Sequence, residues 1–438
     1  MATARRSAVA VALAAVALAT GSLVSGSGAG AAPKAPKADT SVHINQIQVI
    51  GSHNSYHQLP SAPEVALRHS ILGQGDEGMT YQHQPLPFQF QSEKVRQIEL
   101  DVFLDPKGGK YANPLLRSAA GVGPYSPEMD KPGIKVLHIQ DVDYATSCLT
   151  LQDCLGQIES WSTAHPSHAP IAILMELKDD EVTFPGFEFV HPDKFDAAAM
   201  DTLDAEIRKA IPADQLITPD DVRGSHATLN EAVTTDGWPT LESSRGKVMF
   251  LMDNGGDKRK AYLQGHPSLE GRVLFTNANP GDPDAGFVER NDAKDPSIPG
   301  LVKAGYMVRT RADGDTNEAR DNDTSARDAA LASGAQWVST DYPVPGMAIG
   351  FTSPYFAEIP GGTVARCNPV NGPASCSSSA LDTNYTPADL PPLPPGPVDP
   401  TPTTVPTSDT TTPATEPSDG VTYAPAATPV SGSPAYTG

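Results

Sequence analysis

Short apolar segments rich in Val, Ile and Leu recur along the middle of the chain, and polar stretches separate them. A strand that is buried on both faces is typically a continuous apolar run of this length. The segments expected to form strands are Ile47–Ile50, Gln97–Phe103, Lys135–Ile139, Ile171–Leu177, Gln215–Ile217, Lys247–Met252, Val273–Thr276, Tyr306–Thr310 and Ala335–Thr340.

Helix-prone stretches lie between several of these segments. Pro192–Ile211 repeats apolar residues at helical spacing, and Ser325–Ala332 is closed by Gly334. Because parallel strands need long crossovers, which helices supply, this alternation predicts a parallel sheet. About eight such units that close on themselves form an α/β fold, an irregular TIM (β/α)8 barrel with incomplete helices. The pattern does not reveal which of the nine segments lies outside the barrel.

Both ends of the chain are expected to lie outside this domain, which we place at residues 41–384. Residues 1–31 have the features of a secretory signal peptide: Arg5 and Arg6 precede the apolar run Ala8–Ala19, and small residues follow as a cleavage site. The apolar run is too short to span a bilayer. Residues 32–40 form a short leader. Residues 385–438 are rich in Pro and Thr and lack the large apolar residues of a core, so we expect an extended, mobile tail.

The charge and composition of the chain limit the classes of partner that it can bind. The formal net charge is −21, which argues against nucleic-acid binding and gives no general attraction to an anionic membrane. No segment after the signal peptide is long and apolar enough to cross a membrane. We therefore expect a secreted, extracellular monomer without a transmembrane segment, and an anionic substrate would need a cation.

The four cysteines form two local pairs, Cys148 with Cys154 and Cys367 with Cys376. Three pairings are possible, and export together with the close spacing favours disulfides within each pair. A zinc site is the weaker interpretation, because no His lies at ligand spacing inside either pair.

Polar residues gather where the predicted strands end. Side chains at i and i+2 of a strand point the same way, and in a barrel such residues converge on the mouth formed by the carboxyl ends of the strands. The residues in question are His53 and Asn54, Glu99 and Asp101, His138, Glu176 and Lys178, and Arg309 and Arg311.

This set of residues suggests phosphodiester cleavage. Three converging carboxylates raise one another's pKa unless a divalent cation binds between them. The oxygen ligands of Asn54, Glu99, Asp101 and Glu176 suit Ca²⁺ or Mg²⁺ better than zinc. Two histidines beside such a metal, His53 and His138, can serve as general base and general acid.

Each element also has a structural interpretation that stays open. Glu99 and Asp101 can be solvated charges on an edge strand, and Glu176 can form a simple ion pair with Lys178. His138 can be a hydrogen-bonded core histidine. Coincidence explains one strand end more easily than it explains four.

The adjacent His53-Asn54, the Glu99-x-Asp101 strand, His138 and Glu176 resemble the phosphatidylinositol-specific phospholipase C family. They are similar in particular to its secreted bacterial calcium-dependent members and to the catalytic core of the eukaryotic enzymes. The similarity runs from about Ile47 to Pro343. One departure is the long segment Pro106–Ile134, which is expected to form an enlarged loop over the mouth.

The resemblance implies a fold, a substrate and roles. It implies the irregular barrel of the phospholipase C-like phosphodiesterases, calcium on Asn54, Glu99, Asp101 and Glu176, and a transient encounter with phosphoinositide lipid at a membrane surface. His53 would help to remove the inositol 2-hydroxyl proton, and His138 would protonate the diacylglycerol oxygen. Lys178 and Arg309 would contact phosphate or inositol.

Two other functions remain as alternatives. Glycerophosphodiester phosphodiesterases share the barrel, the two histidines and Glu-x-Asp, and the late Ser339–Pro343 stretch resembles one of their strands. Their first His is normally followed by Arg, whereas Asn54 follows here. A catalytically silent calcium-dependent lipid- or glycan-binding module would need no paired histidines.

Overall fold

The computed structural model describes residues 42–183 and 186–388. The predicted signal peptide at 1–31, the leader at 32–40 and all of the tail beyond 388 lie outside these residues. Within the described ranges, no helix has the length and apolar character needed to cross a membrane.

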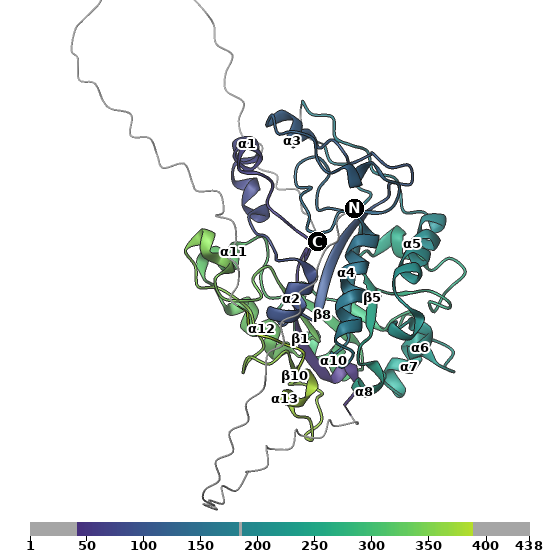
Figure 1. Cartoon of the computed structure of the whole chain (residues 1–438). Helices are drawn as coiled ribbons and strands as arrows, with labels where there is room; N and C mark the ends of the chain where they lie inside the picture. The colour runs from purple at the N-terminus through teal and green to yellow at the C-terminus, as the bar shows by residue number, and fades with distance from the viewer. Residues whose placement is uncertain (1–41, 184–185, 389–438) are drawn as a thin grey trace, which may run out of the picture. The chain divides into compact units, whose positions relative to one another are not determined.

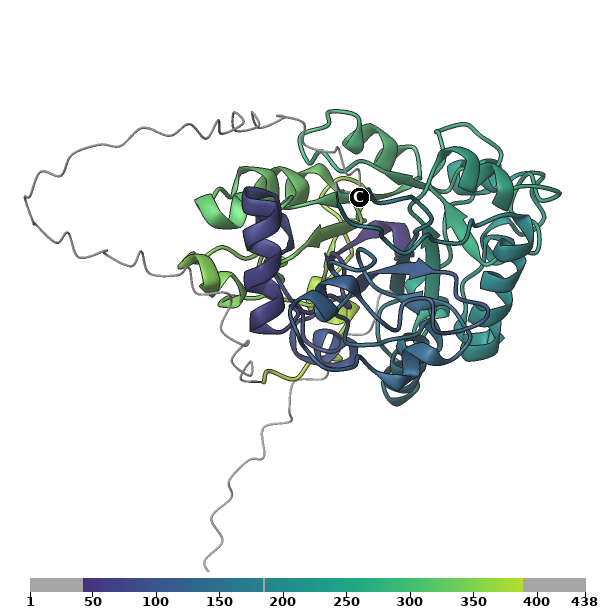
Figure 2. The same ribbon diagram turned by 90° about the horizontal axis from the view of Figure 1, so that it is seen from above.

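Eight parallel strands form the centre of the molecule (Figures 1 and 2). Neighbours in the sheet follow chain order, the last strand pairs with the first, and a parallel bridge between Asn277 and Phe287 joins the two ends of the sheet. The predicted (β/α)8 barrel is therefore confirmed. Its strands are β1 (Ile47–Ser52), β2 (Gln97–Phe103), β4 (Ile171–Leu177), β5 (Val248–Met252), β6 (Leu274–Thr276), β7 (Phe287–Glu289), β8 (Met307–Arg311) and β9 (Trp337–Thr340).

Two of the nine predicted strands do not belong to the barrel. Lys135–Ile139 contributes only β3 (Lys135–Val136), which pairs antiparallel with β2. Gln215–Ile217 makes a single bridge, Leu216 to Val248. The barrel strand that the sequence pattern missed is β7, whose apolar run is only Phe287-Val288, between Gly286 and the charged Glu289.

The helices around the barrel are short, as predicted. The longest that the structure describes are α4 (Leu151–Ala164) and α5 (Ala197–Ala210), where the side chains of Thr150 and Asp196 accept the capping hydrogen bonds. The other helices are α1 (Ala62–Leu72), α2 (Leu86–Ser92), α3 (Leu115–Ala119), α6 (Pro219–Arg223), α7 (Leu229–Thr235), α8 (Leu241–Ser244), α9 (Gly256–Tyr262), α10 (Ile298–Lys303), α11 (Asn317–Asp321), α12 (Ser325–Ser333) and α13 (Ser378–Leu381).

Two predicted helices differ slightly at their ends from the observed ones. The helix expected at Pro192–Ile211 starts later, at Ala197, because Asp196 is extended and caps it. The helix expected at Ser325–Ala332 ends at Ser333, where Gly334 adopts the left-handed conformation (φ 82°) that favours glycine. Short 3-10 segments occupy Ile44–Gln46, Gly73–Met79, Pro127–Asp130, Ala213–Gln215 and Met347–Phe351.

The long segment after β2 is a folded loop with its own core. It carries α3 and a 3-10 turn, and Tyr111 and Met129 pack with Phe103, Leu137 and Tyr144. It leaves the carboxyl end of β2, so it belongs to the mouth side of the barrel, as expected for the enlarged loop.

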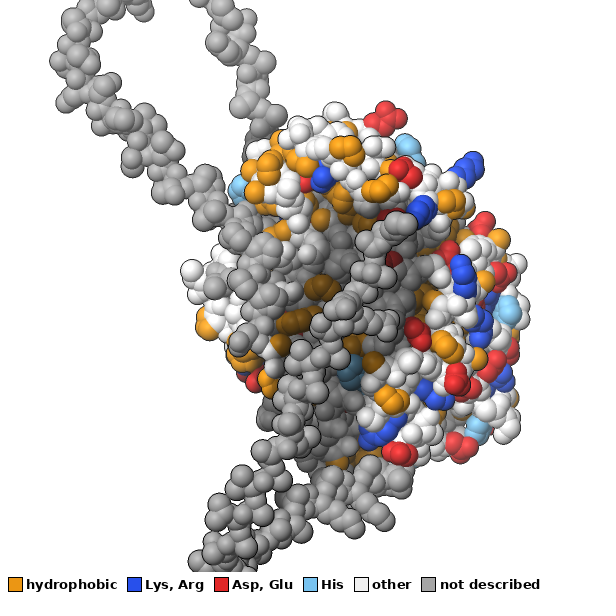
Figure 3. Space-filling model, in the orientation of Figure 1, with side chains coloured by type: hydrophobic (Ala, Val, Ile, Leu, Met, Phe, Trp, Pro, Cys, Tyr) orange, Lys and Arg blue, Asp and Glu red, His pale blue; other side chains and the backbone are white. Residues whose placement is uncertain are grey.

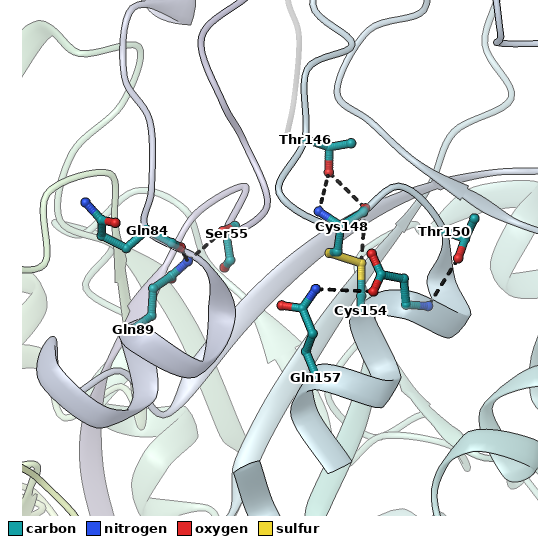
Figure 4. The surroundings of a disulfide bond; sticks show 9 residues. Ser55, Gln84, Gln89, Thr146, Cys148, Thr150, Cys154 and Gln157 are labelled. Carbon is teal, nitrogen blue, oxygen red and sulfur yellow. Dashed lines mark hydrogen bonds between the residues drawn. A yellow bond between two sulfur atoms is a disulfide. The ribbon is translucent and has the colours of Figure 1, made fainter. Parts of the chain in front are cut away.

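Both predicted disulfides are present, and no described cysteine is free. Cys148–Cys154 ties the loop before α4 to the first turn of that helix (Figure 4). Cys367–Cys376 joins β10 (Ala365–Cys367), which pairs antiparallel with β1, to the loop after it. On the described surface in Figure 3, acidic and basic side chains are interspersed.

Candidate active site and metal centre

Three carboxylates converge at the mouth because two neighbouring strands are in register. Asp101 of β2 lies directly beside Glu176 of β4, and Glu99 precedes Asp101 by two residues on the same face. One oxygen from each of the three lies within 4.8 Å of the others. Glu99 and Asp101 are buried, which excludes the interpretation that they are solvated charges on an edge strand.

Burial makes this arrangement costly without a cation. It raises the pKa of Asp101 well above its ordinary value, although Lys178 opposes the rise, and it raises the pKa of Glu99 to about 7 despite Arg309. Both side-chain oxygens of Asp101 are buried without a well-aligned hydrogen bond, and one of them lies 3.3 Å from the Lys178 ammonium. A hard-oxygen set that includes a carboxylate without a well-aligned hydrogen bond fits a calcium ion.

Asn54 follows β1 in a left-handed conformation (φ 42°), which Asn tolerates better than most residues. Its amide nitrogen donates to the Tyr81 hydroxyl at 2.8 Å, which fixes the orientation of the amide. The amide oxygen lies 3.5 Å from the Tyr56 hydroxyl. Burial, followed by the charge of Asp101, raises the pKa of Tyr56, whose hydroxyl is the neighbour of this amide oxygen.

Lys178 forms the ion pair that the structural interpretation anticipated. Its ammonium lies 2.9 Å from a Glu176 oxygen and 3.3 Å from an Asp101 oxygen. Burial alone would raise the pKa of Glu176, but Lys178 outweighs it and the pKa is lowered. Lys178 therefore neutralises the carboxylates between which it lies.

His53 is held by a residue that the sequence analysis noted only within a motif, Asp341. The Nδ1 atom of His53 lies 2.8 Å from the Asp341 carboxylate, which can only accept, so Nδ1 carries the proton. The free Nε2 lies 3.9 Å from Glu99. Burial and the neighbouring Arg311 lower the pKa of His53 well below its ordinary value. The ring is therefore neutral near pH 7 and presents a basic nitrogen.

His138 does not end a strand, contrary to the prediction, but lies in the loop after β3. Its Nδ1 lies 2.7 Å from Asp143, which leaves Nε2 for other contacts. The side chain is 20% exposed, against 11% for His53. Burial lowers the pKa of His138, and Asp143 offsets part of the decrease.

Asp143 belongs to a buried network that the sequence did not reveal. The oxygen that binds His138 also lies 2.8 Å from His57, and the other oxygen accepts from Arg68. Burial alone would raise the pKa of Asp143, but His57 and Arg68 hold it well below its usual range. His57 stacks on Tyr81, with ring centroids 4.5 Å apart, so this network is rigidly packed beneath Asn54 and His138.

Arg309 lies deeper than its predicted role suggests. Its guanidinium is fully buried and donates to Glu99 at 2.8 Å and to Glu289 at 2.5 Å. The guanidinium nearer to His53 is that of Arg311, at 3.5 Å from Nδ1 and 3.7 Å from Asp341. Arg309 therefore supports Glu99, and Arg311 lies closer to the base.

The chain was compared with known families and structures. Residues 42–369 match the family described as phosphoinositide phospholipase C, Ca²⁺-dependent. Solved structures that resemble the fold include a calcium-dependent phosphoinositol-specific phospholipase C from Pseudomonas sp, with 16% identity and a TM-score of 0.46 over 76% of this chain and 97% of that one. A Ca²⁺-dependent phosphatidylinositol-specific phospholipase C from Streptomyces antibioticus has 18% identity and a TM-score of 0.42 over 69% and 96%. No curated protein matches the sequence.

Proposed function

Because the chain belongs to the calcium-dependent phosphoinositide phospholipase C family, we propose that it cleaves phosphatidylinositol to diacylglycerol and an inositol phosphate. The observation that carries the proposal is the pair of carboxylate-bound histidines beside the carboxylate cluster. His53 lies next to Glu99, and His138 acts electrostatically on Glu176. A base and an acid on either side of one cation are what an in-line displacement at phosphorus needs.

The residues that would hold calcium are Asn54, Glu99, Asp101 and Glu176. Bound there, calcium would stabilise negative charge on the phosphoryl oxygens and on the attacking hydroxyl. Lys178 would give up part of its contact with the carboxylates and become available to the phosphate. The fit is supported by the convergence of the three carboxylates within 4.8 Å and by the buried oxygens of Asp101, which lack a well-aligned hydrogen bond.

His53 would act first, as the general base. Asp341 keeps the proton on Nδ1, so Nε2 can accept the proton of the inositol 2-hydroxyl. The hydroxyl oxygen then attacks phosphorus within the same molecule and closes a five-membered cyclic phosphate. This step needs a nucleophile on the substrate and no water.

His138 would act on the other side, as the general acid. Its Nδ1 donates to Asp143, so the proton delivered to the diacylglycerol oxygen comes from Nε2. The proton taken by His53 and the proton given by His138 balance over the step. Water can then open the cyclic phosphate with the two roles exchanged.

The cations at the mouth favour a head group without extra phosphates. Lys178 pairs with Glu176, Arg309 with Glu99 and Glu289, and Arg311 lies beside Asp341. Within the described residues, each of these cations already faces a carboxylate, so further phosphomonoesters would meet more negative than positive charge. Phosphatidylinositol itself is therefore the proposed substrate.

An assay on phosphatidylinositol, glycerophosphoinositol and glycerophosphocholine, with calcium or with chelator, tests the proposal. We expect turnover of phosphatidylinositol with calcium and inositol 1,2-cyclic phosphate as the first product by phosphorus NMR. Turnover of glycerophosphocholine without a cyclic product would instead indicate a glycerophosphodiester phosphodiesterase. No product from any of the three would indicate a binding module.

A further inference from the structure

A groove outside the barrel lies between α2 and α4, away from the mouth residues described above. It has a volume of about 680 Å³. Figure 4 shows the two helices side by side, α2 carrying Gln89 and α4 carrying Gln157. The residues that line the groove are Pro87, Gln152, Asp153, Gly156, Gln157, Ser160, Trp161, Ala164 and His165.

Trp161 and His165 line one end of this groove. The half-buried His165 ring stacks on Trp161, with centroids 4.3 Å apart, and Trp161, which is 6% exposed, packs against the fully buried Phe90 of α2 below the groove. Gly156 has no side chain and Ala164 has a short one, so little side-chain bulk projects from the rest of the groove floor. Grooves lined by aromatic rings with polar side chains at the rim are the surfaces on which proline-rich segments in the polyproline II conformation bind.

The chain itself leads a proline-rich segment to this end of the groove. The backbone nitrogen of Thr386 donates to the Gln91 carbonyl at 3.0 Å, and the Gln91 side chain donates to the Thr386 hydroxyl at 2.7 Å. The same Gln91 side chain accepts from the indole nitrogen of Trp161 at 3.2 Å. The Gln91 side chain therefore bridges Thr386 and Trp161, and Thr386 lies two residues before the last described residue.

The sequence that follows has the composition of a polyproline II ligand. Residues 389–397 read Asp-Leu-Pro-Pro-Leu-Pro-Pro-Gly-Pro. A polyproline II helix has three residues per turn, so in that conformation Leu390 and Leu393 would fall on the same edge. An apolar edge between prolines suits a groove with an apolar floor and a polar rim.

The lengths also agree. Helix α4 has 14 residues, so it is about 20 Å long at a rise of 1.5 Å per residue. A polyproline II segment rises about 3.1 Å per residue, so roughly six or seven residues cover that length. This is the stretch from Asp389 to Pro395. The point of attachment at Thr386 is so close that the effective concentration of the segment at the groove is on the order of millimolar or higher.

We propose that residues 389–395 bind in the groove between α2 and α4 as a polyproline II segment of the same molecule. Leu390 and Leu393 contact the floor at Gly156 and Trp161, and the segment runs along α4 from its C-terminal end toward Gln152. The rest of the tail then leaves the domain near the N-terminal end of α4, on the mouth side of the barrel.

Disulfide trapping in the full chain tests this proposal. The four native cysteines are all paired, so introduced cysteines report on their own proximity. Cysteines are placed one at a time at positions 391, 392, 394 and 395, each together with Ser160→Cys at the groove. The control replaces Ser160→Cys by Ala205→Cys, an exposed position on the neighbouring helix α5 that a freely moving tail also reaches.

At least one tail position is expected to form an intramolecular disulfide with Ser160→Cys about tenfold faster than with Ala205→Cys, because binding raises the local concentration at one site only. Leu390→Ser with Leu393→Ser should remove this preference, whereas Val398→Ser with Val405→Ser, farther along the tail, should leave it unchanged. Equal rates at Ser160→Cys and Ala205→Cys for all four tail positions would overturn the proposal. A disulfide-linked dimer in place of the cross-linked monomer would assign the groove to a second copy and would also overturn it.

Discussion

The two histidines at the mouth are held in different ways. His53 follows a barrel strand, and its partner Asp341 follows the neighbouring strand β9, so strand pairing sets their separation of 2.8 Å. His138 and its partner Asp143 both lie in the loop after β3, and their position depends on the buried His57 and Arg68. The barrel therefore places the proposed base, and loop packing places the proposed acid.

This difference predicts where the site tolerates change. The base is as rigid as the sheet, whereas the acid is as rigid as a loop held by one disulfide and one buried carboxylate. Substitutions in the loop network should alter the acid while leaving the base in place. The experiments below separate the two halves of the site.

Removal of calcium should have the largest effect and should not distinguish the halves. In the proposed mechanism both histidines act on one phosphorus whose charge calcium stabilises, so excess chelator should abolish activity, and added calcium should restore it. Activity and isothermal calorimetry with calcium check this. Full activity in chelator, with no tightly bound metal by elemental analysis, would contradict the proposed metal site.

Replacing either histidine should come next. His53→Ala and His138→Ala should each lose at least ~100-fold in kcat while remaining folded, since a positioned base or acid contributes about 10²–10⁴-fold. A substrate with a good leaving group, such as a nitrophenyl inositol phosphate, needs little protonation. It should rescue much of the His138→Ala loss and little of the His53→Ala loss. Equal rescue of both variants would reject the assigned roles.

Replacing each of the two carboxylates that hold the histidines should change the pH profile of activity in a different way. Asp341→Asn and Asp143→Asn should each lower kcat by about ten- to hundredfold, the usual cost of losing a partner that orients a working side chain. The Asp143 charge raises the pKa of His138, so without it the acid is protonated only at lower pH. The limb on which activity falls with rising pH should therefore move to lower pH in Asp143→Asn and stay in place in Asp341→Asn. A common shift in both variants would contradict the separation of the halves.

Loss of a disulfide should have the smallest effect, and the two disulfides should differ in whether their loss affects the half of the site that holds His138. Replacing Cys148 and Cys154 with Ser should lower the free energy of unfolding by about 2 kcal/mol, given the short loop that they close. Because this loop leads from Asp143 into α4, kcat should also fall. Replacing Cys367 and Cys376, the pair that joins β10 to the loop after it, should lower the free energy of unfolding by a similar amount without changing kcat. Calorimetry and steady-state kinetics on both variants make the comparison.

The sequence predicted the half of the site that strands build. Glu99, Asp101 and Glu176 could be placed together because strand periodicity and the convergence of parallel strands are local rules. The same rules failed for β7, whose apolar run is only Phe287-Val288. They also failed for His138, because the apolar residues around it led to the wrong prediction that it ends a strand.

The loop half could not be predicted because its contacts join distant residues. Asp143 is one of two acids in its loop, and only the fold shows that it meets His57 and Arg68, the latter 75 residues away. Asp341 had a visible signal, since it ends an apolar strand in Ser-Thr-Asp-Tyr, but nothing local identified His53 as its partner. The pairing became visible only when β9 was found beside β1.

The position of Lys178 has a consequence for the order of folding and metal binding. Its ammonium lies against both Glu176 and Asp101, so the chain brings its own positive charge to the place where like charges would otherwise repel. Folding then does not have to wait for an ion from the surroundings. The barrel can therefore close before the proposed calcium ion binds.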